Sequence, residues 1–139
     1  MELYENITVP EATIIQHELR LKLDIRERTL PITTIAGADI SLNLYSTTIY
    51  AGIVILSFPP TGTGCLFIGK SSNPFSLCSG LHGVQGSACV VKVWEQIPVK
   101  PSVLVVDGHG IAHPRRMGIA AHFGTLTGQT TMGLSLIHI

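Results

Sequence analysis

The feature that most constrains the fold is a mostly apolar run at positions 50–58 with the β-branched Ile53, Val54 and Ile55 at its centre. It is far shorter than the ~20 apolar residues that a membrane-spanning helix needs. Its composition instead favours a strand buried in a sheet. A second, shorter run at residues 103–106 has the same character and ends at Asp107. A chain with both runs must form a sheet and cover at least one of its faces.

Helical patterns separate these strand-like segments. Thr8 and Glu11 have the spacing of a capping box with Pro10 in the first turn, so an amphipathic helix is expected to follow them. Further helices are expected at residues 90–97 and about 116–126, and a β-rich segment at 32–44. Strands that alternate with helices predict an α/β domain with a mixed sheet.

Composition limits the classes of function. The 139 residues suffice for one domain, and with 13% charged and 45% hydrophobic residues the chain is not disordered. Nine Lys plus Arg balance nine Asp plus Glu, so no basic tail points to nucleic acid. The acidic N-terminus lacks a signal-peptide core, and we expect a cytoplasmic monomer without membrane segments. Three cysteines without CxxC spacing, Cys65, Cys78 and Cys89, are expected to be free thiols.

The residues around Asp107 could carry chemistry. Gly108 and Gly110 would let a ligand approach the backbone closely, and two histidines and two arginines follow within nine residues. A hard divalent cation needs oxygen ligands, and Asp39, which interrupts another apolar run, could supply a second carboxylate. Turn or capping roles for Asp39 and ordinary loop roles for His109 and the other basic residues are the alternatives. The residues alone favour a metal-assisted phosphoryl hydrolase.

Residues 60–89 do not fit this pattern, because they hold six glycines, all three cysteines and no acid. Residues 64–71, GCLFIGKS, formally match the phosphate-binding loop GxxxxGKS. No clear strand precedes them, and Pro74 hinders the helix that should follow. A nucleotide-binding loop is therefore an alternative that the context disfavours.

The segment VDGHGIAHPRRMGIAAHFG at residues 106–124 resembles the signature segment of endonuclease V. Residues 35–41, IAGADIS, resemble the first metal-binding strand of that family, and the 68-residue spacing from Asp39 to Asp107 also fits. The resemblance implies a ribonuclease-H-like fold, a mixed sheet flanked by helices, here incomplete. It also implies a DNA-repair endonuclease that recognises deoxyinosine and cleaves the second phosphodiester bond on its 3′ side.

By the same resemblance, Asp39 and Asp107 are the catalytic and metal-binding carboxylates, with Mg²⁺ as the cofactor and Mn²⁺ as an alternative. Gly110 and His113 would help to form the pocket for the flipped base. The partner would be DNA containing deaminated bases, with inosine-containing RNA as an alternative.

The family's tyrosine wedge and third carboxylate, carried by a segment like PYVPGFxxFRE, are missing. Counting along the chain places the tyrosine at Leu77 and the glutamate at Gly86. Residues 77–87, back-translated and shifted by one nucleotide, can encode YVPGFMAFRE. We therefore interpret residues 60–89 as frame-shifted, which should remove a core strand and impair activity. A catalytically dead nucleic-acid-binding remnant of the same fold is the alternative.

The end of the sequence also departs from the family. Residues 134–139, LSLIHI, back-translate to a sequence resembling a transposon-end adapter used in sequencing libraries. We therefore expect residues 1–133 to form a single, C-terminally truncated domain, followed by a non-native tail. A native strand at residues 132–139 is the alternative.

Overall fold

A computed structural model describes residues 7–42, 47–62, 64–72 and 82–134. Its centre is a five-stranded mixed sheet with the strand order β3-β2-β1-β4-β5. The strands are β1 (Thr34–Leu42), β2 (Thr48–Ser57), β3 (Cys65–Ser72), β4 (Val103–Asp107) and β5 (Thr131–Leu134). The first three are antiparallel, whereas β4 runs parallel to β1 and β5 parallel to β4.

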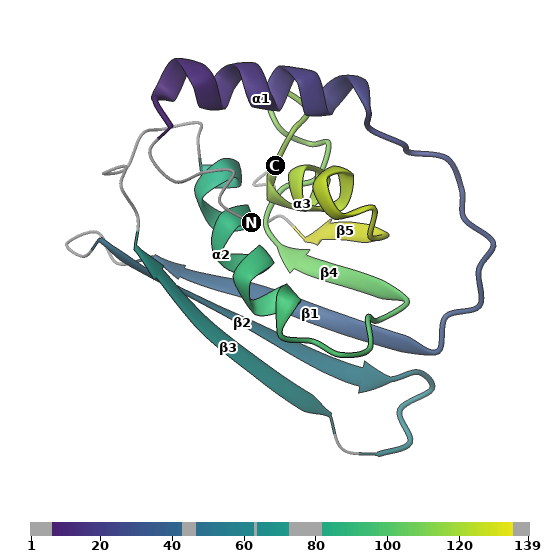
Figure 1. Cartoon of the computed structure of the whole chain (residues 1–139). Helices are drawn as coiled ribbons and strands as arrows, with labels where there is room; N and C mark the ends of the chain where they lie inside the picture. The colour runs from purple at the N-terminus through teal and green to yellow at the C-terminus, as the bar shows by residue number, and fades with distance from the viewer. Residues whose placement is uncertain (1–6, 43–46, 63, 73–81, 135–139) are drawn as a thin grey trace, which may run out of the picture.

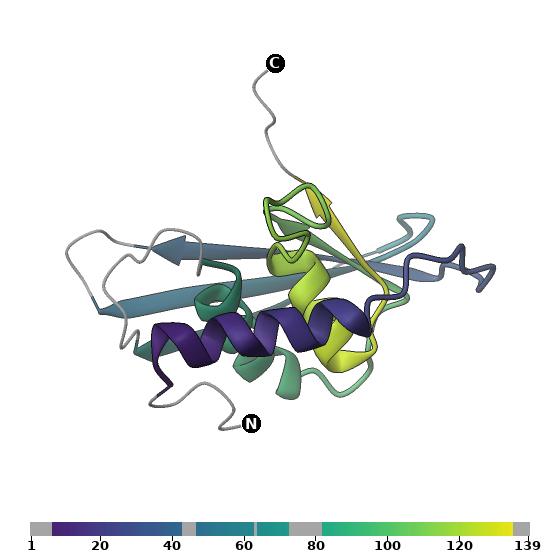
Figure 2. The same ribbon diagram turned by 90° about the horizontal axis from the view of Figure 1, so that it is seen from above.

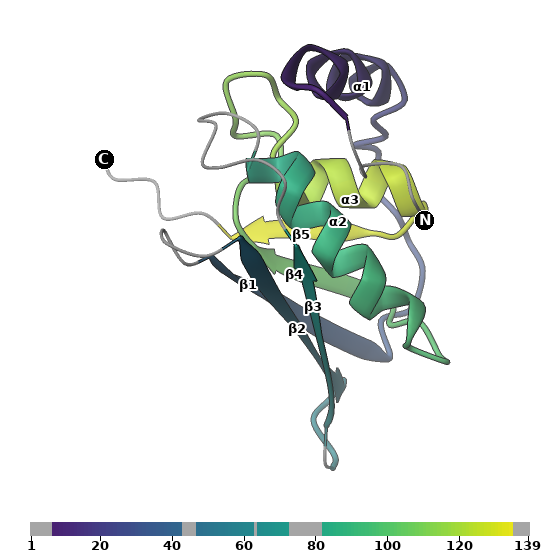
Figure 3. The same ribbon diagram turned by 60° about the vertical axis from the view of Figure 1, so that its left-hand side comes forward.

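Three helices, α1 (Val9–Leu21), α2 (His82–Glu95) and α3 (Ile119–Thr127), lie on one side of the sheet (Figures 1 and 3). The expected capping box begins α1: the backbone N–H and the hydroxyl of Thr8 both donate to Glu11 Oε2 at 2.7 Å. Within the part of the chain described, no helix is long and apolar enough to cross a membrane. The predicted α/β domain with a mixed sheet is confirmed.

The core lies between the sheet and the helices. Alternate side chains of the central strands point inward, and Trp94 of α2 meets Phe123 of α3 edge to face, with ring centroids 5.3 Å apart. The inward-facing strand residues are small or branched and fully buried or nearly so: Ala36, Ala38, Ile49, Ala51, Ile53, Leu104 and Val106. Because side chains alternate along a strand, the intervening residues face away from all three helices.

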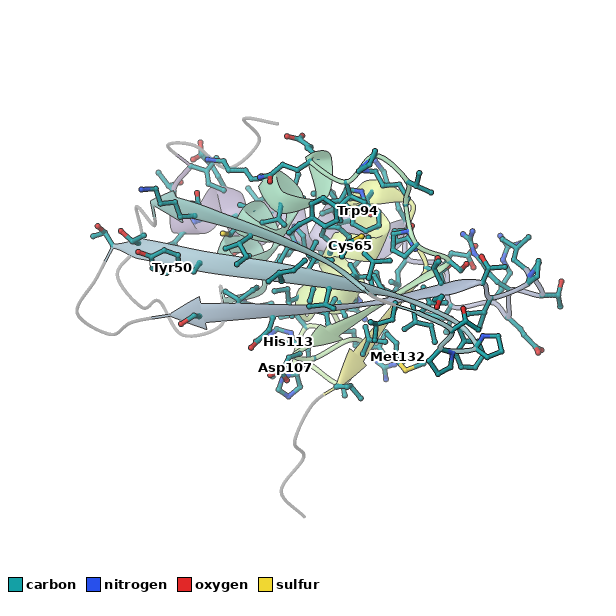
Figure 4. All side chains as sticks on the ribbon, turned by 90° about the horizontal axis from the view of Figure 1, so that it is seen from below. Tyr50, Cys65, Trp94, Asp107, His113 and Met132 are labelled. Atoms are coloured by element: carbon teal, nitrogen blue, oxygen red, sulfur yellow. The ribbon has the colours of Figure 1, made fainter. Side chains whose placement is uncertain are left out.

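No helix of the described segments covers that second surface, which we call the open face (Figure 4). It is markedly apolar, with exposed large side chains from β2, β3 and β5: Tyr50, Val54, Leu56, Leu66, Ile68, Met132 and Leu134. The alternation that fills the core therefore also places a row of apolar groups in solvent.

Two expected boundaries differ. The helix expected at residues 90–97 begins much earlier, at His82, because buried Gly86 and Ser87 and half-buried Ala88 continue its inner face toward the N-terminus. The helix expected from about residue 116 begins at Ile119, because residues 113–116 form a turn. Arg116 has a φ of 54°, and its N–H donates to the carbonyl of His113 at 2.7 Å.

The expectation that residues 60–89 lack a strand is wrong. β3 lies in that window, and its inward-facing Phe67 packs against the core while Leu66 and Ile68 face outward. Alternation of apolar residues is enough to pair a strand with β2, whatever family identities are missing. Leu134 ends β5, and residues 135–139 lie outside the described part, so the expected tail stays a prediction.

Candidate functional site

Two carboxylates meet at the end of the parallel pair formed by β1 and β4. The register pairs Ala38 with Val106, so the next residues, Asp39 and Asp107, lie side by side at the carboxyl ends of the strands. Both point toward the open face, since their neighbours Ala38 and Val106 are buried in the core. The sequence-based pairing of these two acids is therefore what the fold produces.

Both acids border one cavity of about 330 Å³ on the open face. The side chains around the cavity are small or apolar. Gly52 of β2 lies opposite Asp39, and Gly37 lies two residues before Asp39 in β1. Asp39 Oδ1 accepts a hydrogen bond from the backbone N–H of Ile40 at 2.7 Å, and both carboxylates are solvent-exposed. A ligand can therefore reach both carboxylates from solvent.

These carboxylates fit a hard divalent cation. Mg²⁺ is commonly held by one or two carboxylates together with substrate phosphates and water. Among the described residues, however, no group of three His, Cys, Asp or Glu side chains is placed to hold a metal. The donor set is thus compatible with Mg²⁺ or Mn²⁺, but it offers only two carboxylates.

Gly86, the position counted for the third carboxylate, lies near this site. It is buried at the N-terminal part of α2, where a Cβ would come within 2.7 Å of Ile40 Cδ1 and 2.6 Å of Ile119 Cδ1. Ile40 directly follows Asp39, but its side chain points to the helices and that of Asp39 to the open face, so position 86 lies across the sheet from the two carboxylates. Leu77, counted for the tyrosine, lies outside the described residues.

The loop after Asp107 is packed so closely that several of its neighbouring positions leave no room for a Cβ. Gly108 has a φ of 149°, which favours glycine, and a Cβ there would come within 2.5 Å of Ile119. A Cβ on Gly133 of β5 would come within 2.5 Å of Gly110 N and 2.7 Å of Gly108 O. Gly118 N–H donates to Gly110 O at 2.9 Å, which closes the loop. This packing holds Gly110 at a defined distance from the carboxylates.

A long-range contact fixes the far end of the loop. The guanidinium of Arg115 donates from Nη1 to Gln16 Oε1 of α1 at 3.0 Å, and Gln16 is 1% exposed. The backbone N–H of Arg115 donates in turn to His113 Nδ1 at 3.2 Å. Burial, and then the nearby His109 and Arg115, lower the pKa of His113. His113 is therefore held as a neutral ring whose Nδ1 is an acceptor.

Gln16 carries no signal in the sequence, because its partner is 99 residues away and no local pattern marks the pair. Of the other histidines, His17 is exposed and His122 is fully buried, and burial lowers the pKa of His122 to about 4. His17 therefore faces solvent and His122 is part of the core, whereas the side chains of His82 and His138 lie outside the described residues.

The disfavoured nucleotide-binding loop at residues 64–71 is excluded, because that segment is the extended strand β3. Cys65 is an exposed free thiol and Cys89 a buried one, as expected, whereas Cys78 lies outside the described residues. Burial raises the pKa of Cys89, whose thiol donates to the carbonyl of Ile49 at 3.6 Å, so Cys89 is an inert core residue.

Comparison with known proteins decides the family. The family model for endonuclease V matches residues 15–136. The chain belongs to the endonuclease V family. An endonuclease V of Trichormus variabilis is 34% identical over 130 residues, which are 93% of this chain and 59% of that protein.

Solved endonuclease V structures share the fold. The enzyme of Streptomyces avermitilis superposes with a TM-score of 0.77 at 30% identity, covering 92% of this chain and 57% of that one. Endonuclease V of Ciona intestinalis, bound to DNA containing an inosine followed by a ribo-adenosine, gives a TM-score of 0.76 at 25% identity, covering 96% of this chain and 60% of that one. The ribonuclease-H-like fold is therefore confirmed, and the chain spans less than two thirds of the length of these endonuclease V proteins.

Proposed function

We propose that this chain acts as a metal-dependent endonuclease on deoxyinosine in DNA and cleaves the second phosphodiester bond 3′ to the lesion. The observation that carries the proposal is the register of β1 and β4, which brings Asp39 and Asp107 together at an open cavity. Membership of the endonuclease V family and the inosine-containing DNA bound by the Ciona intestinalis relative support the substrate.

Asp39 and Asp107 would hold the cation. When bound, Mg²⁺ or Mn²⁺ polarises a phosphate and lowers the pKa of the attacking water. The chain's own contribution is to keep the two carboxylates in register and exposed on the same face of the sheet, beside the glycine positions that leave room for the phosphate. Two carboxylates should bind a cation less tightly than three, so we expect weak activity.

His113 and Gly110 would recognise the flipped base. Because His113 Nδ1 accepts the N–H of Arg115, the neutral ring carries its proton on Nε2 and presents a donor. Deamination replaces the amino group of adenine, a donor, with the carbonyl of hypoxanthine, an acceptor. A donor in the pocket therefore favours hypoxanthine over adenine, and unpaired lesions are also the easiest to flip.

A second candidate is a nucleic-acid-binding remnant of the same fold without catalysis. Gly86 favours this candidate, since no carboxylate stands where counting places the third one. The two candidates share the pocket for the base but differ in metal-dependent cleavage.

The test uses a labelled duplex with one deoxyinosine, a matched adenine duplex and the same inosine site in RNA, each with Mg²⁺, Mn²⁺ or EDTA. We expect cleavage only in the DNA strand that contains deoxyinosine, and only when Mg²⁺ or Mn²⁺ is present. Replacing one metal ligand, Asp107→Asn, should lower the cleavage rate by at least roughly a hundredfold, because loss of groups that merely orient ligands already costs 10–100-fold.

Glu18→Gln, on the exposed surface of α1, removes the same charge away from the site and should leave the rate unchanged. Equal cleavage by Asp107→Asn and the unmodified chain would contradict the assignment of the carboxylates. Inosine-selective binding without any cleavage would instead establish the remnant.

A further inference from the structure

All five arginines of the chain fall in two short segments, residues 20–28 and 115–116. The structure brings the segments together, because Arg115 reaches Gln16 of α1 and residues 22–28 directly follow that helix. After α1 the chain arches around the side where α3 and β5 meet before it enters β1 (Figures 1 and 2). The arginines are therefore gathered around one side of the loop that follows Asp107.

A pocket of about 570 Å³ lies under this arch. Lys22, Arg26 and Arg28 line it from the arch, and Gly110 and Ile111 line it from the loop after Asp107. Its remaining wall is made largely of small residues of α3 and of the turn into β5: Ala120, Ala121, Gly124 and Gly128. The volume falls within the ~300–1,000 Å³ typical of ligand sites.

The charged groups of the pocket are mainly cationic. Asp24 is its single lining carboxylate, and Arg26 holds it in a two-point contact, with Nε–Oδ1 at 2.9 Å and Nη2–Oδ2 at 2.8 Å. Within the described segments, no carboxylate lies within ion-pair distance of Lys22 or Arg28, although Arg28 is close enough to Asp24 to help hold its pKa low. Lys22 and Arg28 can therefore meet an anion that enters the pocket.

The pocket and the carboxylates are joined by the same loop. Gly110 lies three residues after Asp107, a separation of at most about 10 Å along the chain. Gly133 of the edge strand β5 lines the 570 Å³ pocket on the helical side, and the next residue, Leu134, lines the cavity of Asp39 and Asp107 on the open face. A strand with a phosphate at Asp107 would therefore pass around the edge of the sheet at β5 to reach the arch.

We propose that the pocket under residues 22–28 binds the sugar-phosphate backbone of the substrate strand, with Lys22 and Arg28 contacting its phosphates. The inference rests on the proposed function and extends it from the cleaved bond to the path of the strand. Guanidinium groups suit this ligand because their donors match phosphate oxygens in pairs.

The test measures binding of the full chain to a fluorescein-labelled inosine-containing DNA strand by anisotropy, in EDTA, between about 50 and 200 mM salt. Arg28→Ala and Lys22→Ala should each weaken binding about threefold to fivefold, as expected for an exposed ion pair. Each should also reduce the slope of log K against log salt by about 0.7, the value for one contact to a single strand. Arg28→Lys should retain the slope but not the full affinity.

Lys70→Ala is the matched control, because it removes one exposed positive charge from β3, on the opposite edge of the sheet. Unchanged slopes in Arg28→Ala and Lys22→Ala, with normal binding by the unmodified chain, would overturn the pocket assignment alone. No binding of the inosine strand by the unmodified chain would overturn the proposed function as well. Competition by inorganic phosphate as strong as that by an unlabelled strand would indicate a small-anion site and also overturn the proposal.

Discussion

Residues 107–134 and residues 60–89 both contribute a strand and helical residues, but they do so by different means. Around Asp107 the packing leaves no room for a Cβ at three glycines: Gly118 and Gly133 approach the backbone of the loop, and Gly108 approaches the side chain of Ile119. In β3, by contrast, the pattern of inward Phe67 and outward Ile68 suffices. In residues 65–89 a Cβ at Gly69 or Gly86 would meet the ends of side chains, whereas at Gly118 or Gly133 it would meet backbone atoms. The requirement for glycine is therefore stricter around Asp107.

This difference bears on the frame-shift hypothesis for residues 60–89. A shifted reading frame keeps the length of a segment but changes its residues. Residues 60–89 form a strand that was not expected, but they supply no carboxylate near Asp39. We propose that the unshifted reading frame of the gene encodes the family's tyrosine and glutamate within this segment.

The largest effect is expected at Gly133. Gly133→Ala places a Cβ against Gly110 N and Gly108 O, and backbone atoms cannot move aside as a flexible side chain can. We expect a loss of about 2–3 kcal/mol in the free energy of unfolding, measured by urea denaturation, with loss of cleavage as the loop shifts.

Gly37→Ala is the control, because a Cβ there meets nothing within 4 Å. It lies in β1, where replacing glycine reduces the entropy lost on folding, so its stability should be unchanged or slightly higher. Equal losses in both variants would mean that glycine matters in this sheet for reasons other than close packing of the loop.

A gain of function is expected at Gly86. Gly86→Glu would place a third carboxylate beside Ile40, from where it must reach past the carboxyl ends of β1 and β4 to join Asp39 and Asp107. It should then raise metal-dependent cleavage by roughly tenfold, about 1.4 kcal/mol, by tightening cation binding. In Gly86→Gln the new side chain has nearly the same size and meets the same Ile40 and Ile119 methyl groups. A difference in cleavage between the two variants therefore reports the effect of the charge. The steric cost of about 1–3 kcal/mol should be common to both variants.

Metal titrations of the two variants give the decisive comparison. An Ile119→Val background reduces the crowding at Gly86 in case both variants unfold. If Gly86→Glu and Gly86→Gln gave the same apparent metal affinity, position 86 would not face the two carboxylates. The count that places the family's glutamate at residue 86 would then be wrong.

The sequence predicted the elements and the paired acids because both depend on local signals. The capping box at Thr8 and the apolar runs of β2 and β4 predict their own structure, and Asp39 and Asp107 each stand out within or after such a run. Residues 35–41 and 106–124 resemble the family, which the family model and the shared fold confirm.

What the sequence did not predict depends on contacts between distant segments. The Gln16–Arg115 hydrogen bond joins residues 99 positions apart. The early start of α2 and the strand in residues 65–72 depend on packing against β2, which overrides the glycine-rich composition. The close approach of Gly133 to Gly110 likewise exists only after β5 pairs with β4.

The smallest effect on stability is expected at Ile68, on the outer side of β3. Its side chain is 62% exposed on the open face opposite Gly52, and threonine keeps the β-branched shape that suits a strand. Ile68→Thr should change the free energy of unfolding by less than about 0.5 kcal/mol, whereas Phe67→Leu, facing the core, should cost about 1 kcal/mol. Light scattering should show slower aggregation of Ile68→Thr, because β3 is an edge strand whose exposed apolar groups can pair with another chain. A large loss of stability in Ile68→Thr would mean that β3 requires particular residues too, and the contrast between the two regions would then fail.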